Sequence, residues 1–226
     1  MSQSLAFLGC AAAYVVAYLT RRVHRLPVLL LAAAVVAVVL VLLGPTFEMP
    51  FREGIAPYSF LLGPMTVALA VPLAEASARK EQRAPLGFTT ALLLGSAAIG
   101  AVTIVLVARS LGASPVACAS LAPRAATSAL SVPTSEALAG SASLTSVIVA
   151  TSGVVVGLVG PWLLSLLGVK SPTARGLALG ASGHLVATAR AWEESREAGT
   201  ASTFALIVHG IFTVGVSFLL HALRFF

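Results

Sequence analysis

The stretch that decides the fold is "GLALGASGHLVATARAWEE", residues 176–194. It is apolar and small enough to lie within a bilayer. It nevertheless contains a histidine, an arginine, three glycines and four side chains with a hydroxyl or acid group. Three interpretations are open for it: an irregular transmembrane helix, a catalytic motif or a binding element.

The composition of the whole chain indicates a membrane protein. The 226 residues are 58% hydrophobic and only 10% charged, whereas about a quarter of the residues of a soluble domain are charged. Several runs approach or exceed the roughly 20 apolar residues that cross a hydrocarbon core. We therefore predict an all-α, polytopic helical membrane protein. Its clearest spans are residues 5–19, 27–43, 86–108, 143–167 and 203–222.

The formal net charge of +6 fits this class better than it fits a nucleic-acid-binding protein. The basic residues fall mostly in short segments beside the apolar runs, where cytoplasmic loops carry an excess of Lys and Arg. The chain has no basic tail and no aromatic surface for stacking bases, so we expect no nucleic-acid partner. The residues that mark the cytoplasmic side early in the chain are Arg21, Arg22, Arg25, Arg79, Lys80 and Arg83.

Cysteines and histidines give no sign of a metal or cofactor. Cys10 and Cys118 are far apart and form no CxxC or metal-binding spacing, so we predict buried structural thiols. The four histidines are scattered and no HExxH motif is present. We therefore expect neither a metal site nor a cofactor.

A sixth span is predicted in "FLLGPMTVALAVPLAEASARK", residues 60–80. Pro64 and Pro72 each remove a backbone donor and kink a helix. The two kinks are interpreted as gating hinges of a broken helix, with simple packing devices as the alternative.

A second polar segment, "SPVACASLAPRAATSALSVPTSEALAG" at residues 114–140, resembles the opening stretch in character. It has three prolines, many hydroxyls and an arginine, and is too polar for a lipid-facing helix. A shift of 57 positions places Pro115 on Pro172, Glu136 on Glu193 and Thr127 on His184. Each segment precedes an apolar span, so the pattern indicates an internal duplication.

In this chain the positive-inside rule is satisfied better if the two polar segments re-enter the membrane than if they cross it. If each segment re-enters from one side, Lys170 and Arg175 join most other basic residues on the cytoplasmic side. If each crosses, these two fall outside. We therefore predict an inverted repeat with about six spans and two opposed re-entrant elements.

The predicted organisation is one membrane domain over residues 1–226. Residues 1–43 form two scaffold spans, 59–140 a first half with the kinked helix and the first re-entrant element, and 141–226 a second half with the second. A homodimer is expected, because carriers of this design usually need a fixed scaffold, and the first two spans are the candidates for its interface.

Broken helices at membrane depth survive only where protein or a water-filled cavity satisfies the backbone. Their half-helix N-termini attract anions. On a helix, Arg124 and Ser128 would share a face, as would Thr127 with Ser131 and His184 with Thr188. We predict that these polar side chains bind a small carboxylate. The predicted substrate-binding residues are Arg124, Thr127, Ser128, Ser131, His184 and Thr188, and the predicted breaks or gates are Pro64, Pro72, Pro123, Gly180 and Gly183.

These residues also have structural interpretations. The hydroxyls can simply bond neighbouring helices, and Arg124 can face water at the end of its element. His184 is the candidate for proton coupling, since ionisable groups inside membranes are usually functional. His209, isolated in the last span, is interpreted as a structural bridge.

An enzymatic alternative rests on "GASG", residues 180–183, which matches the GxSG of rhomboid-type intramembrane proteases. Ser182 would be the nucleophile and His209 the base. Four small residues are a weak pattern in this chain, the Trp-Arg loop of rhomboids is missing, and the duplication stays unexplained. We therefore expect no enzyme and no catalytic residue.

Three stretches together carry a resemblance to a known family: "FLLGPMTVALAVPL", "SLAPRAATSALSVPTSEALAG" and "ARGLALGASGHLVATARAWE". They resemble the hallmark motifs of the LrgB/CidB family over most of the chain, least in the first two spans. Arg124 stands where the family usually has Lys, Ala129 where it has Pro, and Ala187 where it has Gly. These departures bear on the substrate more than on the fold.

The resemblance implies two possible functions. Bacterial members are described as holin- or antiholin-like, modulating murein hydrolase activity and lysis beside a small LrgA/CidA-type membrane partner. A plastidal relative is similar to a glycolate/glycerate translocator, and other members are linked to pyruvate and similar acids. The duplicated hydroxyl-rich elements favour a carrier of a small monocarboxylate in a bacterial plasma membrane, with the antiholin-like function as the alternative.

Overall fold

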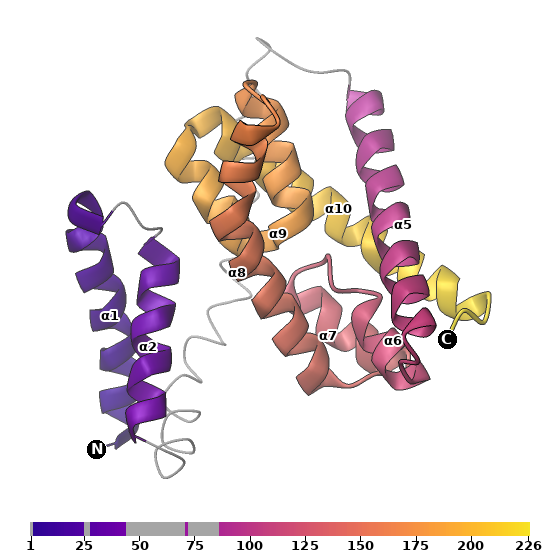
Figure 1. Ribbon diagram of the computed structural model, residues 1–226, viewed down its shortest axis with the longest axis horizontal. Helices are drawn as coiled ribbons and strands as arrows, with labels where there is room; N and C mark the ends of the chain where they lie inside the picture. Colours follow the sequence, from indigo (N-terminus) through magenta and orange to yellow (C-terminus); the bar gives the residue numbers. More distant parts are fainter. Residues whose placement is uncertain (1, 25–27, 44–70, 72–85) are drawn as a thin grey trace. The chain divides into compact units, whose positions relative to one another are not determined.

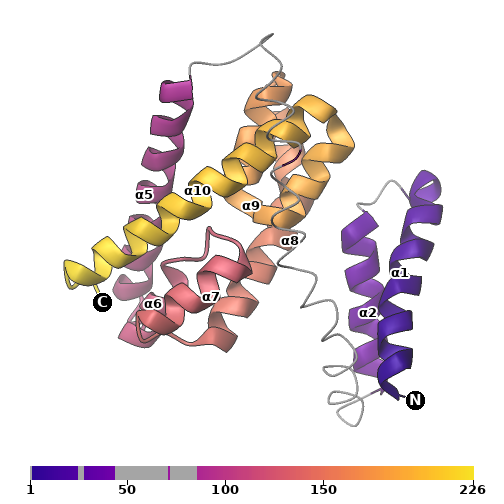
Figure 2. The same cartoon turned by 180° about the vertical axis from the view of Figure 1, so that it is seen from behind.

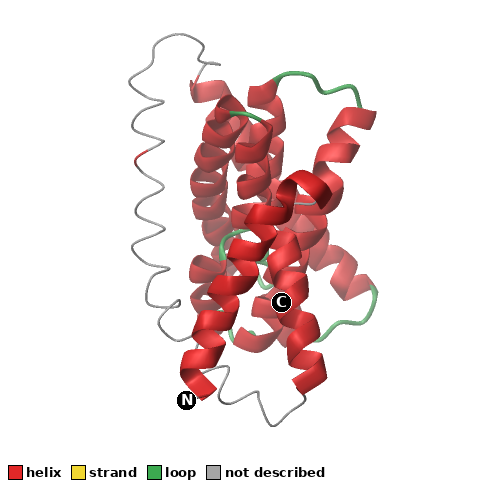
Figure 3. Ribbon diagram, turned by 90° about the vertical axis from the view of Figure 1, so that its left-hand side faces the viewer, coloured by secondary structure: helices red, strands yellow, loops and turns green. Residues whose placement is uncertain are grey.

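The computed structural model describes residues 2–24, 28–43, 71 and 86–226, and all statements on structure below refer to these. The regular elements in these ranges are helices, without a strand (Figure 3). The chain divides into two compact units, Met1–Ala70 and Val71–Phe226, which we treat separately. Pro64 and Pro72, and with them the sixth predicted span, lie outside the described residues. A single domain over residues 1–226 stays a prediction.

The first unit contains two helices, α1 (Ser2–His24) and α2 (Val28–Leu43). Ala17 and Ala32 are buried between them and Leu31 packs on this pair. Small side chains at the contact let two helices approach closely. Both predicted N-terminal spans are helical, and α1 runs beyond the predicted residues 5–19 at each end.

The second unit contains the functional elements (Figure 1). Three of its helices are long and apolar enough to cross a membrane, and many of their bulky apolar side chains, such as Ile99, Val147 and Trp162, are exposed. They correspond to the predicted spans, although the last begins at Arg196 rather than Thr203. The helices are α5 (Leu86–Ser110), α6 (Pro115–Leu121), α7 (Ser128–Ala137), α8 (Ala142–Leu166), α9 (Pro172–Glu194) and α10 (Arg196–Ala222).

The opening stretch folds back on itself. In a straight helix, residues 175 and 194 would lie about 28 Å apart, at a rise of ~1.5 Å per residue. In α9, however, Arg175 Nε donates to Glu194 Oε2 at 2.7 Å and Nη2 donates to Oε1 at 2.9 Å. The reversal occurs at Gly183 and His184, the two residues without helical dihedral angles. Thus α9 is a helical hairpin whose ends lie on one side, as the re-entrant prediction requires.

The Arg175 guanidinium also holds the base of this hairpin to α8. Its Nη1 donates to Ser165 Oγ at 3.2 Å and to the Val169 carbonyl at 3.1 Å, and Nη2 donates to the Pro161 carbonyl at 3.1 Å. One planar side chain with five N–H donors therefore joins both ends of α9 to the end of α8.

α6 and α7 form a second, shorter hairpin. Thr145 Oγ1, near the start of α8, lies 2.7 Å from Ser135 Oγ of α7 and 3.2 Å from the Ser120 carbonyl of α6. The Ser141 N–H donates to Ser120 Oγ at 2.8 Å. The C-terminal ends of α6 and α7 are thus tied to the start of α8, and residues 122–127, which connect the two helices, form the tip.

The two hairpins repeat the same local chemistry at nearly constant spacing. Ser114 and Ser171, 57 residues apart, each cap a helix that begins with proline. Gly112 and Gly168 precede them with φ of 80° and 72°, the left-handed conformation that ends a helix. This matched capping supports the internal duplication inferred from the sequence.

The connections place the hairpins at opposite ends of α8. The α6–α7 hairpin leads into its start, and α9 follows its end, as both views of the ribbon show (Figures 1 and 2). With α8 across the bilayer, the hairpins enter from opposite faces. This is the inverted arrangement predicted from the sequence.

The first arm of α9 packs on α10 at backbone distance. A Cβ at Gly176 would collide with the Ala198 carbonyl, and one at Gly180 with the Ser202 carbonyl. Only glycine allows this approach. The prediction that Gly180 breaks the helix is wrong, because it has helical backbone and the break follows at Gly183.

The hairpin predicts a specific pattern of accessibility. In a background with Cys10 and Cys118 replaced by alanine, Lys170→Cys and Glu193→Cys should react with a membrane-impermeant maleimide from the same face. Leu111→Cys should react from the opposite face. Labelling of Lys170→Cys and Glu193→Cys from opposite faces would show instead that α9 crosses the membrane.

The Arg175–Glu194 pair should contribute measurably to stability. Its side chains are only 14% and 19% exposed, so Glu194→Gln should lower the free energy of unfolding by about 1–3 kcal/mol. Thermal unfolding in detergent measures this. The matched control is Glu193→Gln, which removes the more exposed pair with Arg190 and should cost less than about 1 kcal/mol. Equal losses in the two variants contradict the assigned role.

Candidate functional site

The tip of the α9 hairpin lies against the middle of α8. His184 is 3% exposed, and its Nε2 is 3.2 Å from Ser152 Oγ. A Cβ added at Gly153 would lie within 3.2–3.4 Å of Val186 and the Gly183 carbonyl, so the absence of a side chain there makes room for the tip. Because Ser152 is near the centre of a helix long enough to span a bilayer, the tip reaches the membrane interior.

The tip of the α6–α7 hairpin lies against the middle of α10. His209 stands midway along that helix, and its ring lies beside the backbone of Ala125. A Cβ at the next residue, Gly210, would lie 3.8 Å from the Cβ of Ala126. The two hairpin tips therefore meet the two long helices at similar depth, one from each side.

His184 has a backbone conformation that L-residues rarely adopt, with φ of 48° and ψ of −137°. Such a conformation costs on the order of 1–3 kcal/mol and persists only where surrounding structure holds it. Here the hydrogen bond to Ser152 and the base of the hairpin hold it. It brings the imidazole to the start of the second arm, residues 185–194, whose first N–H groups lack helical partners.

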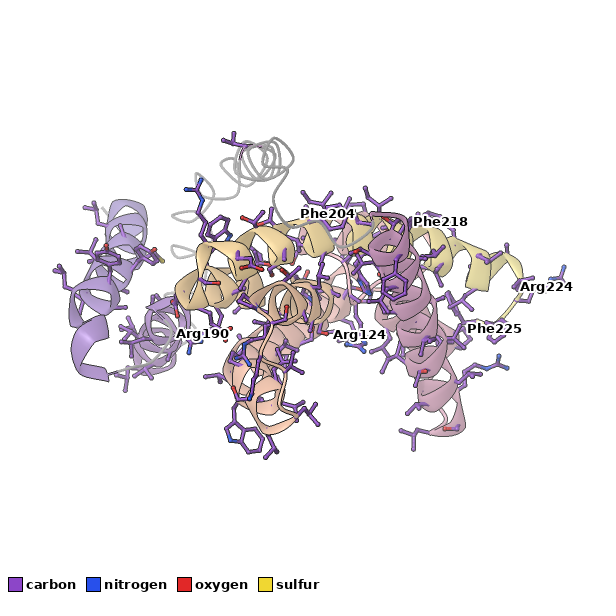
Figure 4. All side chains as sticks on the ribbon, turned by 90° about the horizontal axis from the view of Figure 1, so that it is seen from above. Arg124, Arg190, Phe204, Phe218, Arg224 and Phe225 are labelled. Carbon is purple, nitrogen blue, oxygen red and sulfur yellow. The ribbon has the colours of Figure 1, made fainter. Side chains whose placement is uncertain are left out.

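Near the two hairpin tips, the described residues include buried side-chain atoms that have no hydrogen-bond partner. Two buried side-chain nitrogens there have no hydrogen-bond partner, Arg124 Nε and His184 Nδ1. Arg124 interacts electrostatically with both His184 and His209, so the three belong to one polar region. Figure 4 shows Arg124 between Arg190 and Arg224 when the bundle is viewed from above. A buried unpaired donor such as Arg124 Nε suits a bound anion, and His184 Nδ1 can become a second donor when it takes up a proton.

The first hairpin provides some of its predicted residues to this region and uses others in its own fold. Arg124 lies in the turn before α7, so it does not share a helical face with Ser128, as the sequence had suggested. Thr127 is the N-cap of α7, but its side chain makes no capping bond. Ser128 is exposed. Ser131 Oγ is 2.7 Å from the carbonyl of Pro123 and 2.9 Å from that of Ala126, holding the tip together.

Thr188 and Arg190, on the second arm of α9, have partners of their own. Thr188 Oγ1 accepts a hydrogen bond from Ser202 Oγ of α10 at 2.9 Å, and both side chains are buried. Arg190 pairs with Glu193 near the end of the arm. Thr188 thus joins α9 to α10, which is the structural role considered for the hydroxyls. Thr127 and His184 occupy corresponding positions, each directly before the second arm of its hairpin.

The serine-protease arrangement is not formed in the described structure. Ser182 is exposed on α9, whereas His209 is 4% exposed and has Thr213 Oγ1 as a partner, 3.4 Å from its Nδ1. No hydrogen bond joins Ser182 to His209. In the same part of the chain, no three His, Cys, Asp or Glu side chains gather to hold a metal ion.

The sequence pattern gave no sign of Ser152 and undervalued His209. Ser152 resembles the many serines of this chain that bond a carbonyl of their own helix, as Ser146 does. Its contact with His184 depends on a residue 32 positions away. Ser152 and His209 each lie midway along an apolar span, and this position is the one signal in the sequence that could have identified them.

Long apolar helices and two opposed hairpins with polar tips define a helical membrane protein of inverted-repeat design. The LrgB-like family model matches residues 10–223. The chain therefore belongs to the LrgB-like family.

Three similar proteins carry the same name. Antiholin-like protein LrgB of Bacillus mycoides (strain KBAB4) is 33% identical over 188 residues, covering 83% of this chain and 80% of that protein. Proteins of the same name from Bacillus cereus (strain B4264) and Bacillus anthracis (strain CDC 684 / NRRL 3495) are 32% identical with the same coverage. No solved structure matches the chain.

Ser131 should be needed for the tip and Ser128 should not. Ser131→Ala removes the hydroxyl between two tip carbonyls and should lower the free energy of unfolding by about 1 kcal/mol. Ser128→Ala, at an exposed position on the same helix, is the control and should change it by less than about 0.5 kcal/mol. Thermal unfolding in one detergent compares the two. A larger loss in Ser128→Ala would contradict this assignment.

Proposed function

We propose that this LrgB-family membrane protein is a multi-pass carrier of a small monocarboxylate in a bacterial plasma membrane. The observation that carries the proposal is the pair of opposed hairpin tips at mid-depth, with the unpaired buried nitrogens of Arg124 and His184 beside them. A binding element near the midplane between inverted elements is the arrangement that alternating access requires.

The chemistry of the site suits one carboxylate group. The Arg124 guanidinium can offer two parallel N–H donors to a carboxylate. Thr127 has a hydroxyl not used for capping, and the second arms of both hairpins begin there with free N–H groups and the positive ends of their dipoles. The residues of this proposal are therefore Arg124, Thr127 and His184. Ser131 and Thr188 support them through contacts within the fold.

An antiholin-like role is the second candidate. The names of the relatives support it more directly than they support a carrier. In this role the chain would act with a small LrgA-type membrane partner to restrain lysis, and a homodimer through α1 and α2 is compatible with either role. Hairpins with buried polar tips have no evident use in such a role, which is why the geometry favours the carrier.

Uptake into proteoliposomes separates the two candidates. A carrier should take up labelled glycolate, glycerate, pyruvate or lactate with saturation, and one acid should compete with another. An antiholin-like protein should show no carboxylate uptake, while deletion of its gene should change lysis under stress. Unsaturable leakage of all small solutes alike contradicts the carrier.

Arg124 should be essential for uptake through its charge. Arg124→Gln removes a charge-assisted hydrogen bond and should reduce kcat/KM for uptake at least about tenfold. Arg124→Lys keeps the charge but loses the parallel pair of donors, so its uptake should fall between that of Arg124→Gln and that of the unmodified protein. The control is Arg190→Gln, at a partly exposed cation paired with Glu193. Uptake by Arg124→Gln equal to that of the control would overturn the assignment of Arg124.

A further inference from the structure

The two central histidines differ in what their rings can still bind. The His209 ring has a partner in Thr213 Oγ1, and neither of its nitrogens is among the buried side-chain nitrogens without a partner. His184 uses Nε2 for Ser152, and its Nδ1 is buried without a partner. Of the two rings, His184 is therefore the one with a nitrogen left for a ligand or a proton.

The hydrogen bonds of Ser152 determine where the His184 ring carries its proton. The Ser152 hydroxyl has one proton and donates it to the Val149 carbonyl at 3.0 Å. Towards His184, at 3.2 Å, its oxygen can then only accept, so Nε2 carries the hydrogen. The opposite assignment would leave a buried Nδ1–H donor without an acceptor, which proteins avoid.

This tautomer restricts what Nδ1 can bind. In the neutral ring Nδ1 is a lone pair, which accepts a hydrogen bond and cannot donate one. A carboxylate has only acceptor atoms, so it gains a partner at Nδ1 only when that nitrogen takes up a proton. Anion binding and protonation are therefore linked at one atom.

The charges around His184 favour the same linkage. Arg124 from the α6–α7 turn is the cation that faces it, His209 comes from α10, and α8 presents the neutral Ser152. Arg109 of α5 is bound to the Phe225 carbonyl at the far end of that helix. The acidic side chains of the described residues lie at helix ends: Glu136, Glu193, Glu194 and Glu197. An anion that arrives with one proton leaves the net charge of the buried site unchanged, which limits the cost of burying it.

We propose that Ser152 is a positioning residue that keeps the His184 proton on Nε2, so that Nδ1 takes up one proton with each carboxylate. The proton comes from water on the side of entry, forms the Nδ1–H bond, and returns to water on the side of release. Transport is then electroneutral and driven by a pH gradient. This inference rests on the proposed carrier function and adds its coupling.

The first test measures protons and carboxylate together. Proteoliposomes with an internal pH dye should show one proton entering per labelled anion, and uptake should respond to a pH gradient and not to a membrane potential. Ser152→Ala should lose the gradient-driven part of uptake by about tenfold, and Ser152→Thr, which keeps the hydroxyl, should retain it. The control is Ser146→Ala, at an exposed serine that bonds only its own helix.

The outcomes separate the two proposals. Saturable uptake without proton entry, or an unchanged gradient response in Ser152→Ala, overturns the coupling and leaves the carrier standing. Absence of uptake for every acid overturns the carrier and the coupling with it. Nitrogen-15 NMR of the unmodified protein, with the His184 signal assigned by its loss in His184→Gln, tests the tautomer independently of transport. A neutral ring with its proton on Nδ1 overturns the role of Ser152.

Discussion

The reversal of α9 at Gly183 and His184 is the constraint on which the rest of this structure depends. A chain that turns back inside a bilayer exposes backbone groups that lipid cannot satisfy. The turn is stable only because its surroundings are built for it. Arg175 and Glu194 hold the base of the hairpin, and α8 receives the tip where Gly153 has no side chain.

The same requirement explains the packing of small residues around the site. α9 approaches α10 through Gly176 and Gly180, so close that a side chain at either position would strike a carbonyl of α10. Ser202 and Thr188 then bond across this contact. In a membrane, where lipid is as apolar as the helices, such contacts hold helices together in place of a hydrophobic effect. Both hairpins are thereby fixed to long helices, and their tips are positioned at mid-depth.

A single histidine combines the strain of the turn with the chemistry of the site. His184 has an unfavourable backbone conformation, a buried ring and one unpaired nitrogen. The equivalent position in the other hairpin is Thr127, which is neutral. The duplicated framework thus carries different chemistry in its two halves, with a titratable ring at one tip and a guanidinium at the other.

The prediction from sequence succeeded where the signal is local or repeated. Apolar length predicted the positions of α5, α8 and α10, and the aligned prolines Pro115 and Pro172 marked the start of each hairpin. It was wrong about Gly180, because a glycine that breaks a helix and a glycine at a close helix contact cannot be distinguished from the sequence alone. It also placed Arg124 and Ser128 on one helix, since nothing in the composition shows that α7 begins only at Ser128.

The amino-acid sequence alone determined that this protein is a helical membrane protein with two related, opposed re-entrant elements. Apolar length, the positive-inside rule and internal repetition are all properties of the linear chain. Only the tertiary structure decided which polar side chains serve the fold and which remain unpaired. That division depends on partners distant in sequence: Ser152 for His184, Ser202 for Thr188, and Glu194 for Arg175. The sequence around a hydroxyl or a guanidinium does not show whether such a partner lies beside it in the folded protein.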